Sequence, residues 1–374
     1  MSQPLEELRK KLDQIDEAVL RLLAERQEVI GQVVQAKRQT KVPVYVAGRE
    51  QEKTDRFRTQ AEELGIDPDW AEDFLRMMMS ASRANQSEAT FPSATAEPKT
   101  WLIVGGEGGM GRLYAGLARK SGHVVRTLDR NDWLRAKALI EGADVVLITV
   151  PINLTKDVIA RVARFMSPEQ LLCDFTSLKA DYVAAMTQAH AGPVVGLHPM
   201  HGPDVRQVSR QLMVVCEGRQ PDASEWLIRQ FELWGMRIKR ADAGIHDRAM
   251  HLVQGLRHFV ALLHASFMNR LDLRPEDMLD YSSPIYRAEL MMTGRIFAQD
   301  ARLYADIVFS DSERRQLLTD FLAHHTQLSE MVQTGDKEKF IREFEAATDF
   351  FGEFGPQALR ESGYLINRLA DRFG

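Results

Sequence analysis

Residues 101 to 111 read Trp-Leu-Ile-Val-Gly-Gly-Glu-Gly-Gly-Met-Gly, and this stretch decides the fold of the chain. Its four apolar residues predict a short buried strand. Gly106, Gly108 and Gly111 follow with the G-x-G-x-x-G spacing of a dinucleotide-binding turn. In that motif the first glycine permits the tight turn, the second lets the backbone approach a pyrophosphate, and the third lets the helix pack closely on the strand. The helix that follows would point its first N–H groups at the phosphates, whereas the alternative interpretation is a turn that binds no ligand.

An acidic residue after the next predicted strand supports the dinucleotide site. Asp129 follows the strand 123–128 and lies 18 positions after Gly111. A carboxylate at this place can accept hydrogen bonds from a ribose diol. Arg126 and Arg130 flank it and could instead bind a 2′-phosphate, so NADP stays open, but the acid favours NAD as the cofactor.

Strands and helices alternate over residues 101–245, which predicts a Rossmann-type α/β domain with a parallel, doubly wound sheet. Further buried strands are expected at 144–150 and 171–175. Ser177 and Lys179 come just after the second of these, at the edge where such sheets bind their ligands. The alternative is that both side chains are solvated in a loop.

The next candidate region is Val194-Val-Gly-Leu-His-Pro-Met-His-Gly-Pro-Asp204. A short apolar strand delivers His198 into a turn, where an imidazole can act as a general base near neutral pH. His198, His201 and Asp204 are spaced by threes. Because the segment is not helical, this spacing does not place them on one face, and we predict no metal site.

Residues 5–39 predict one long helix with an apolar heptad seam. The seam consists of Leu5, Leu8, Leu12, Ile15, Val19, Leu22, Val29 and Val33. Arg26 completes the seam, and Arg9 and Lys37 border it. A helix of this length spans about 50 Å, which is more than a unit of this size covers alone, so we expect two copies to pack together as a homodimer.

Two shorter helices are expected after the long one. The second begins near Arg49 and Glu50, and the third runs from about 69 to 85, with Ser82 and Gln86 close to its end. The basic residues of these helices either pair with acids on their own surface or line an anion pocket. A pocket of this kind would suit a small dicarboxylate, because arginine can bind a carboxylate through two hydrogen bonds.

The rest of the chain completes a multidomain prediction. Residues 1–90 form the all-α domain, 91–100 a linker rich in Ser, Thr, Ala and Pro, 101–245 the Rossmann-like domain, and 246–374 a second all-α domain. The last of these contains Gly294-Arg-Ile-Phe-Ala-Gln-Asp300, in which Arg295 either pairs with Asp300 or binds a ligand.

Composition excludes several classes of protein. The formal net charge of −5 argues against nucleic acid as a partner. No apolar run reaches the ~20 residues that a membrane helix needs. The N-terminus lacks the pattern of a signal peptide, and Cys173 and Cys216 lie in apolar runs, so we expect a cytoplasmic protein with reduced, buried thiols.

Residues 5–86 resemble the all-helical chorismate mutases. The resemblance implies a chorismate site made of seven side chains, namely Arg9, Arg26, Lys37, Arg49, Glu50, Ser82 and Gln86. In this family the arginines and the serine meet carboxylates, the lysine and the glutamine contact the ether oxygen, and the glutamate holds the hydroxyl. One arginine, matched best by Arg9, comes from the partner subunit.

Residues 101 to about 304 resemble prephenate dehydrogenases. His198 matches the catalytic histidine of a His-Pro-Met-x-Gly-Pro motif, in which the family usually has an aromatic residue where this chain has His201. The matched roles for the remaining residues are a serine near the substrate hydroxyl (Ser177), a carboxylate-binding arginine (Arg295), and pocket positions for Lys179, His258 and Tyr304.

The order of the two halves resembles the bifunctional chorismate mutase–prephenate dehydrogenases of tyrosine biosynthesis. It implies that chorismate is rearranged to prephenate, that prephenate is oxidatively decarboxylated to 4-hydroxyphenylpyruvate with NAD, and that tyrosine acts as a feedback inhibitor. The alternatives are an arogenate dehydrogenase whose N-terminal helices only dimerise, and a nucleotide-sensing protein without turnover.

Overall fold

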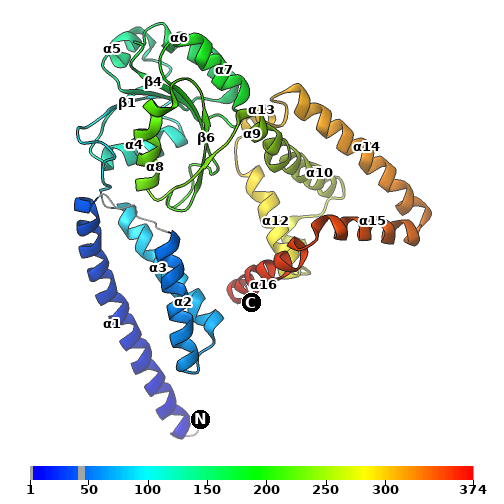
Figure 1. Cartoon of the computed structure of the whole chain (residues 1–374). Helices are drawn as coiled ribbons and strands as arrows, with labels where there is room; N and C mark the ends of the chain where they lie inside the picture. The colour runs from blue at the N-terminus through cyan, green and yellow to red at the C-terminus, as the bar shows by residue number, and fades with distance from the viewer. Residues whose placement is uncertain (1–2, 41–46, 89, 374) are drawn as a thin grey trace. The chain divides into compact units, whose positions relative to one another are not determined.

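The computed structural model describes residues 3–40, 47–88 and 90–373 (Figure 1). The chain divides into two compact units, residues 1–246 and 247–374. The first unit contains three helices followed by an α/β sheet domain, and the regular structure of the second is entirely helical in its described residues. The predicted order of all-α, α/β and all-α parts is therefore confirmed. Within the described residues, no helix is both long enough and apolar enough to cross a membrane.

The N-terminal part consists of α1 (Gln3–Thr40), α2 (Ala47–Glu63) and α3 (Pro68–Glu88). Helices α2 and α3 bury Ala61, Leu75 and Met79 between them. The predicted seam of α1 is largely uncovered in the single chain, since Leu8 and Leu22 are 60% and 64% exposed. An apolar stripe of this size on a long helix is typical of a surface that another chain covers.

The sheet domain is built on one sheet with the strand order β2-β1-β3-β4-β5-β6-β7 among the described residues. The strands are β1 (Thr100–Val104), β2 (Val124–Leu128), β3 (Val145–Ile148), β4 (Leu171–Asp174), β5 (Val194–Pro199), β6 (Leu212–Glu217) and β7 (Arg237–Arg240). Neighbouring strands pair in parallel except β5 and β6, which are antiparallel. The predicted parallel sheet therefore has one antiparallel step, between β5 and β6, whose connection follows His198 and Pro199.

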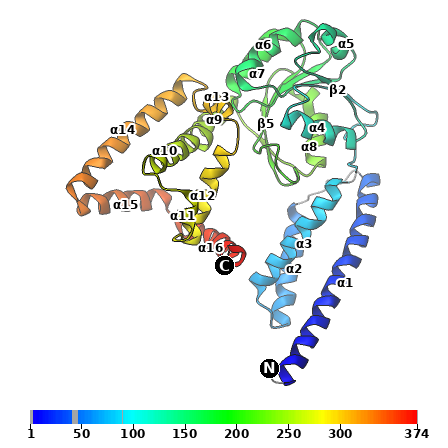
Figure 2. The same ribbon diagram turned by 180° about the vertical axis from the view of Figure 1, so that it is seen from behind.

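Helices cover both faces of this sheet (Figures 1 and 2). The helices α4 (Gly109–Lys120) and α8 (Glu225–Leu233) lie on one face, and α5 (Ala136–Ile140), α6 (Ile152–Ala163) and α7 (Ala180–Ala189) lie on the other. Trp101, Tyr114 and Trp234 are fully buried in the core between the sheet and the first pair of helices. The central strands β1, β3, β4 and β5 are buried along almost their whole length, as expected for strands that helices cover on both faces.

The predicted linker forms no helix or strand before Thr100, where β1 begins, and it is attached to the sheet domain. Phe91 is 5% exposed and its N–H donates to the carbonyl of Lys120. The buried Gln230 accepts from the N–H of Ala94 and donates to the carbonyl of Pro92. The composition predicted a junction without regular structure. It could not predict these contacts, because Lys120 and Gln230 lie far from the junction in the sequence.

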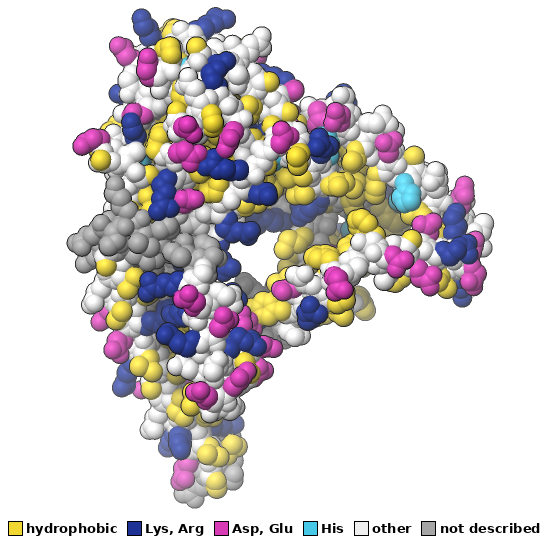
Figure 3. All heavy atoms as spheres, in the orientation of Figure 1, with side chains coloured by type: hydrophobic (Ala, Val, Ile, Leu, Met, Phe, Trp, Pro, Cys, Tyr) yellow, Lys and Arg dark blue, Asp and Glu magenta, His cyan; other side chains and the backbone are white. Residues whose placement is uncertain are grey.

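The second unit contains a π-helical segment, His251–Leu256, and a series of α-helices. The helices are α9 (Ala243–Met250, which begins in the first unit), α10 (Arg257–Arg270), α11 (Pro275–Leu279), α12 (Pro284–Phe297), α13 (Ala301–Val308), α14 (Ser312–Thr334), α15 (Lys337–Phe351) and α16 (Phe354–Phe373). Many of their large apolar side chains are exposed, including Phe344 at 63% and Leu359 at 76%. Figure 3 shows hydrophobic side chains on the surface of this unit.

Candidate active sites

The glycine-rich turn joins β1 to α4 as predicted, but the glycine that permits the tight turn is not the one that the motif indicated. The left-handed backbone conformation belongs to Gly105, with φ +87°, and not to Gly106. Gly106 is required for another reason, because a Cβ there would lie 2.3 Å from the Thr127 side chain. A Cβ on Gly111 would lie 2.3 Å from the carbonyl oxygen of Gly105, which is the predicted close packing of helix and strand. Gly108 directly precedes α4 and leaves the backbone open to a ligand.

A cavity of about 350 Å³ opens beside this turn. It is lined by the ends of β1, β2 and β3 and by residues along α6, including Gly105, Gly108, Asp129, Arg130, Trp133, Thr149, Pro151 and Arg161. The chain order reverses around β1, and open α/β sheets bind their ligands at such a switch point. The guanidinium of Arg161 lies 3.5 Å from the Trp133 ring centroid, so these two side chains form a stacked wall.

The environment of Asp129 fits a dinucleotide. Its Oδ1 accepts a hydrogen bond from the N–H of Glu107 at 3.1 Å, whereas its Oδ2 is buried and has no hydrogen-bond partner among the described residues. A buried carboxylate oxygen without a donor is costly, and a ribose hydroxyl would satisfy it. Arg126 donates to the carbonyls of Leu139 and Glu141, which leaves Arg130 as the flanking arginine that lines the cavity.

His198 lies near the end of β5 and is 3% exposed. Its Nδ1 is 2.9 Å from Nε2 of His246, and the two rings meet edge to face. This contact fixes the orientation of the imidazole of His198. The sequence predicted His246 only as part of a helix start, because nothing local connects positions 48 residues apart.

Lys179 is fully buried, which does not support the predicted substrate contact. Its Nζ lies 2.6 Å from Asp174 Oδ2 and 2.9 Å from the carbonyl oxygen of Leu197. The ammonium thus neutralises a buried acid and fixes the backbone directly before His198. Ser177 is half-buried in the same loop, one turn before α7.

In the N-terminal helices the structure brings four of the predicted mutase residues together. Arg26 Nη1 donates to Ser82 Oγ at 2.6 Å, which joins α1 to α3. Burial and the charges of Arg26, Arg56 and Arg49 lower the pKa of Lys53, so these cations lie close to one another. Glu50 accepts a hydrogen bond from Arg83 at 2.5 Å.

Two residues of this cluster, Lys53 and Arg83, were missed from the sequence. Lys53 lies one helical turn after Arg49, on the same face, and this spacing could have revealed it. The side chains of Lys37 and Gln86 lie outside the described residues. Arg9 is exposed on α1, and 17 residues of helix separate it from Arg26 by about 25 Å, so one chain cannot bring both to one small ligand.

The candidate residues of the second unit lie on α10, α12 and α13. The rings of His258 and Tyr304 meet edge to face with centroids 4.8 Å apart, so these two side chains are neighbours. Burial and the charges of Arg257 and Arg314 lower the pKa of His258 to about 4. Arg295 is exposed on α12, and Asp300 caps α13 by accepting from the N–H of Arg302.

Three family models match the chain. They are "Chorismate mutase type II" over residues 8–87, "Prephenate dehydrogenase, nucleotide-binding domain" over 116–228 and "Prephenate dehydrogenase, dimerization domain" over 242–346. The T-protein of Haemophilus influenzae is 38% identical over 98% of this chain and 97% of its own length. That of Enterobacter agglomerans is 39% identical over 97% of both chains.

Among solved structures, the prephenate dehydrogenase from A. aeolicus in complex with hydroxyphenyl propionate and NAD+ has a similar fold. Its TM-score is 0.54 at 17% sequence identity, and the match covers 69% of this chain and 100% of that one. A likeness at this level of identity establishes the fold of the sheet domain and the helices after it.

Proposed function

The chain belongs to the T-protein family, enzymes that join a chorismate mutase to a prephenate dehydrogenase, and we propose how its residues carry out these two reactions. The observation that carries the assignment of the mutase site is the cation cluster around Arg26. The dehydrogenase site rests on the glycine cradle with the open Oδ2 of Asp129. The family was predicted from sequence motifs, and the comparisons confirm it.

In the mutase part, the cluster around Arg26 is suited to a doubly negative substrate. The rearrangement of chorismate to prephenate is intramolecular and needs no nucleophile or proton transfer, so catalysis consists of holding the folded conformer and stabilising charge on the ether oxygen. We assign Arg26, Arg49 and Ser82 to the carboxylates and Glu50 to the hydroxyl. Lys37 and Gln86 keep their predicted role at the ether oxygen.

In the dehydrogenase part, Gly106, Gly108, Gly111 and Asp129 would hold the dinucleotide. When bound, NAD supplies the oxidation by accepting hydride from the ring of prephenate as CO2 leaves. His198 acts as the general base at Nε2, which requires that its Nδ1–H donates to His246 Nε2. Arg295 binds a prephenate carboxylate, and Ser177, His258 and Tyr304 contribute to the pocket.

We propose NAD over NADP as the cofactor. The buried Oδ2 of Asp129 can accept from a ribose hydroxyl but would repel a 2′-phosphate. Arg126, which could have bound that phosphate, is engaged with two backbone carbonyls. Both observations favour the cofactor without the extra phosphate.

We also propose that the enzyme is a homodimer, that it works in the cytoplasm and that tyrosine inhibits it. The exposed seam of α1 and the match to a dimerization domain support the first proposal. The two cysteines are free and buried, as is usual in a reducing compartment. The proposed tyrosine inhibition has only the family resemblance as its support.

A subunit-mixing experiment tests the dimer and Arg9 together. In a homodimer whose mutase site takes Arg9 from one chain and Arg26 from the other, Arg9→Ala and Arg26→Ala chains are each inactive. A refolded equal mixture then has one intact site in half of its dimers, so about a quarter of wild-type mutase activity returns. A mixture as inactive as its parents contradicts the shared site.

The assignment of the two reactions is tested by supplying chorismate and NAD and following NADH and 4-hydroxyphenylpyruvate. Arg26→Ala should abolish product from chorismate but not from added prephenate. His198→Asn should abolish product from both, and prephenate should accumulate when chorismate is supplied. Turnover of the His198→Asn variant within tenfold of wild type rejects His198 as the base, because general bases commonly contribute ~100-fold or more. Arogenate, offered in parallel, tests the alternative substrate.

A further inference from the structure

The loop that follows His198 touches the helix that follows the dinucleotide turn at two points. A Cβ added to Gly109, the first residue of α4, would lie 2.8 Å from the ring of Pro203. One turn further along α4, the hydroxyl of Tyr114 is 3.2 Å from Nε2 of His201. The segment carrying the proposed base and the helix carrying the proposed phosphate site are therefore in direct contact.

The hydrogen bonds of His201 define its tautomer. Its Nδ1 lies 2.9 Å from the carbonyl oxygen of Gly202, which can only accept, so Nδ1 carries the proton. Burial lowers the pKa of His201, while the Gly202 carbonyl and the Asp204 carboxylate oppose that shift. The ring is then neutral at physiological pH, and Nε2 accepts a hydrogen bond from the Tyr114 hydroxyl.

Tyr114 is a rigid partner for this bond. Its side chain is 0% exposed, and its ring packs against Phe175 at 4.5 Å and Trp234 at 5.9 Å between centroids. The hydroxyl can also donate to the thioether sulfur of Met236, at 3.7 Å, which is a weak acceptor. The imidazole of His201 is thus the stronger acceptor available to a buried hydroxyl.

We propose that His201 is a positioning residue of the dehydrogenase, which fixes the loop after His198 onto the dinucleotide-binding helix through Tyr114. His201 can act in this way only if the dehydrogenase site proposed above is correct. The bond fixes the loop after His198 relative to α4, and hydride and proton transfer require these two elements to stay in position. Misplacement of reacting groups by about 1 Å can lower the rate 100-fold.

Three variants of the full-length enzyme separate this role from simple packing. Tyr114→Phe removes only the hydroxyl, His201→Phe keeps a ring but removes the acceptor, and His201→Gln offers an amide oxygen near the place of Nε2. We expect the first two to lower the dehydrogenase kcat/KM for NAD about fivefold, the loss typical of one hydrogen bond, and His201→Gln to restore most of it.

Two controls complete the experiment. The mutase activity of every variant, measured in the same preparation, should equal that of wild type, because the helical part does not share this contact. The double variant Tyr114→Phe/His201→Phe should be no slower than either single variant, since all three lack the same bond. Equal activity of all variants, or losses that multiply in the double variant, would overturn the role of His201. Normal turnover of His198→Asn in the same assay would instead overturn the proposed dehydrogenase site itself.

Discussion

The buried ion pair of Lys179 and Asp174 allows a quantitative prediction about the sheet domain. Both side chains are 0% exposed, and their charged atoms are 2.6 Å apart. The change Lys179→Met keeps the length of the side chain but leaves the carboxylate with the two donors of Thr176 and no countercharge. Breaking a buried pair in this way costs roughly 3–5 kcal/mol, which lowers the Tm of a domain of this size by ~10 °C.

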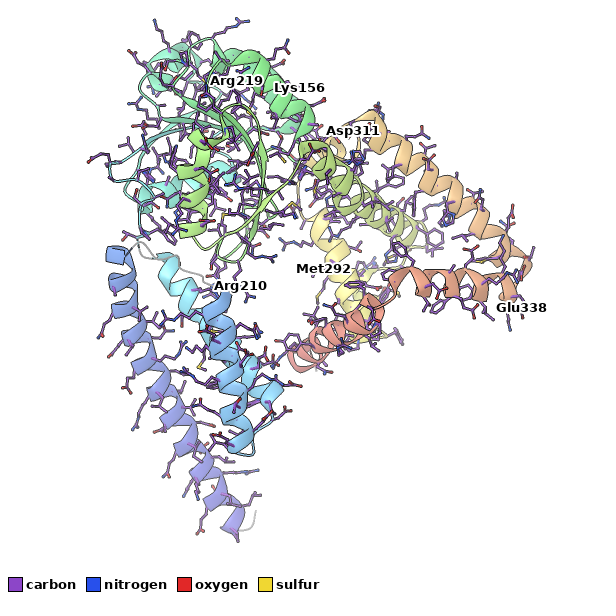
Figure 4. All side chains as sticks on the ribbon, in the orientation of Figure 1. Lys156, Arg210, Arg219, Met292, Asp311 and Glu338 are labelled. Carbon is purple, nitrogen blue, oxygen red and sulfur yellow. The ribbon has the colours of Figure 1, made fainter. Side chains whose placement is uncertain are left out.

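A matched control is provided by Lys156, which lies on α6 (Figure 4). It makes an ion pair of the same length, 2.6 Å, with Asp181, but these side chains are 52% and 74% exposed. Lys156→Met should therefore cost no more than about 1 kcal/mol. Of the five tryptophans only Trp70 lies outside the sheet domain, so urea unfolding followed by tryptophan fluorescence reports on the correct part of the chain.

The same variant tests whether Lys179 contacts the substrate. Because Lys179 also donates to the carbonyl of Leu197, its loss should displace His198 and lower kcat while the KM for prephenate stays unchanged. In Asp174→Asn/Lys179→Met the buried charge is gone, so part of the stability should return. Equal unfolding of the Lys179→Met and Lys156→Met variants, or a raised KM with unchanged kcat, would refute the reasoning.

Three further predictions concern the other sites. Asp129→Asn should lower kcat/KM for NAD at least tenfold, because the hydrogen bonds from the ribose would no longer go to a charged group. Steady-state kinetics with NAD and with NADP measure the effect, and an unchanged NADP-to-NAD ratio of kcat/KM contradicts the role of Asp129. Arg295→Gln should raise the KM for prephenate but not the KM for NAD, as steady-state kinetics with each substrate varied will show. Burial lowers the pKa of His123, His190 and His201, and the pKa of His258 to about 4. In the unfolded chain these histidines bind a proton near pH 6.5, whereas in the folded protein they bind it only at lower pH. The Tm should therefore be highest above pH 6.5 and should fall between pH 6.5 and 4. A constant Tm over this range would count against buried neutral histidines.

Much of the sheet domain could be predicted from sequence because its signals are local. The glycine spacing, the acid after β2 and the apolar run before His198 each occupy a few consecutive residues. Their placement follows from one rule, that parallel strands present their carboxyl ends at one edge of the sheet. The α/β fold, and a cavity beside the glycine turn, follow from these signals.

What could not be predicted depends on contacts between distant positions. The partnership of His198 with His246 and the burial of Lys179 arise only when β5 is placed beside α7 and α9. The left-handed glycine could not be assigned either, since Gly105 and Gly106 are adjacent and only the position of Thr127 distinguishes them. Periodicity likewise placed Arg26 on the seam but could not show that Ser82 and Lys53 surround it.

The contrast between Lys53 and Lys179 suggests how a lysine of a site can be told from a lysine of the scaffold. Lys179 is completely buried, yet its charge is already balanced by Asp174, so a ligand has nothing to neutralise. Lys53 is only partly buried, but its neighbours are mostly cations, and their repulsion adds to burial in lowering its pKa. A dianion bound there would relieve that repulsion, whereas a dianion near Lys179 would find a neutral pair. We therefore propose that uncompensated positive charge, more than burial or motif membership, marks the surface where this enzyme would receive chorismate.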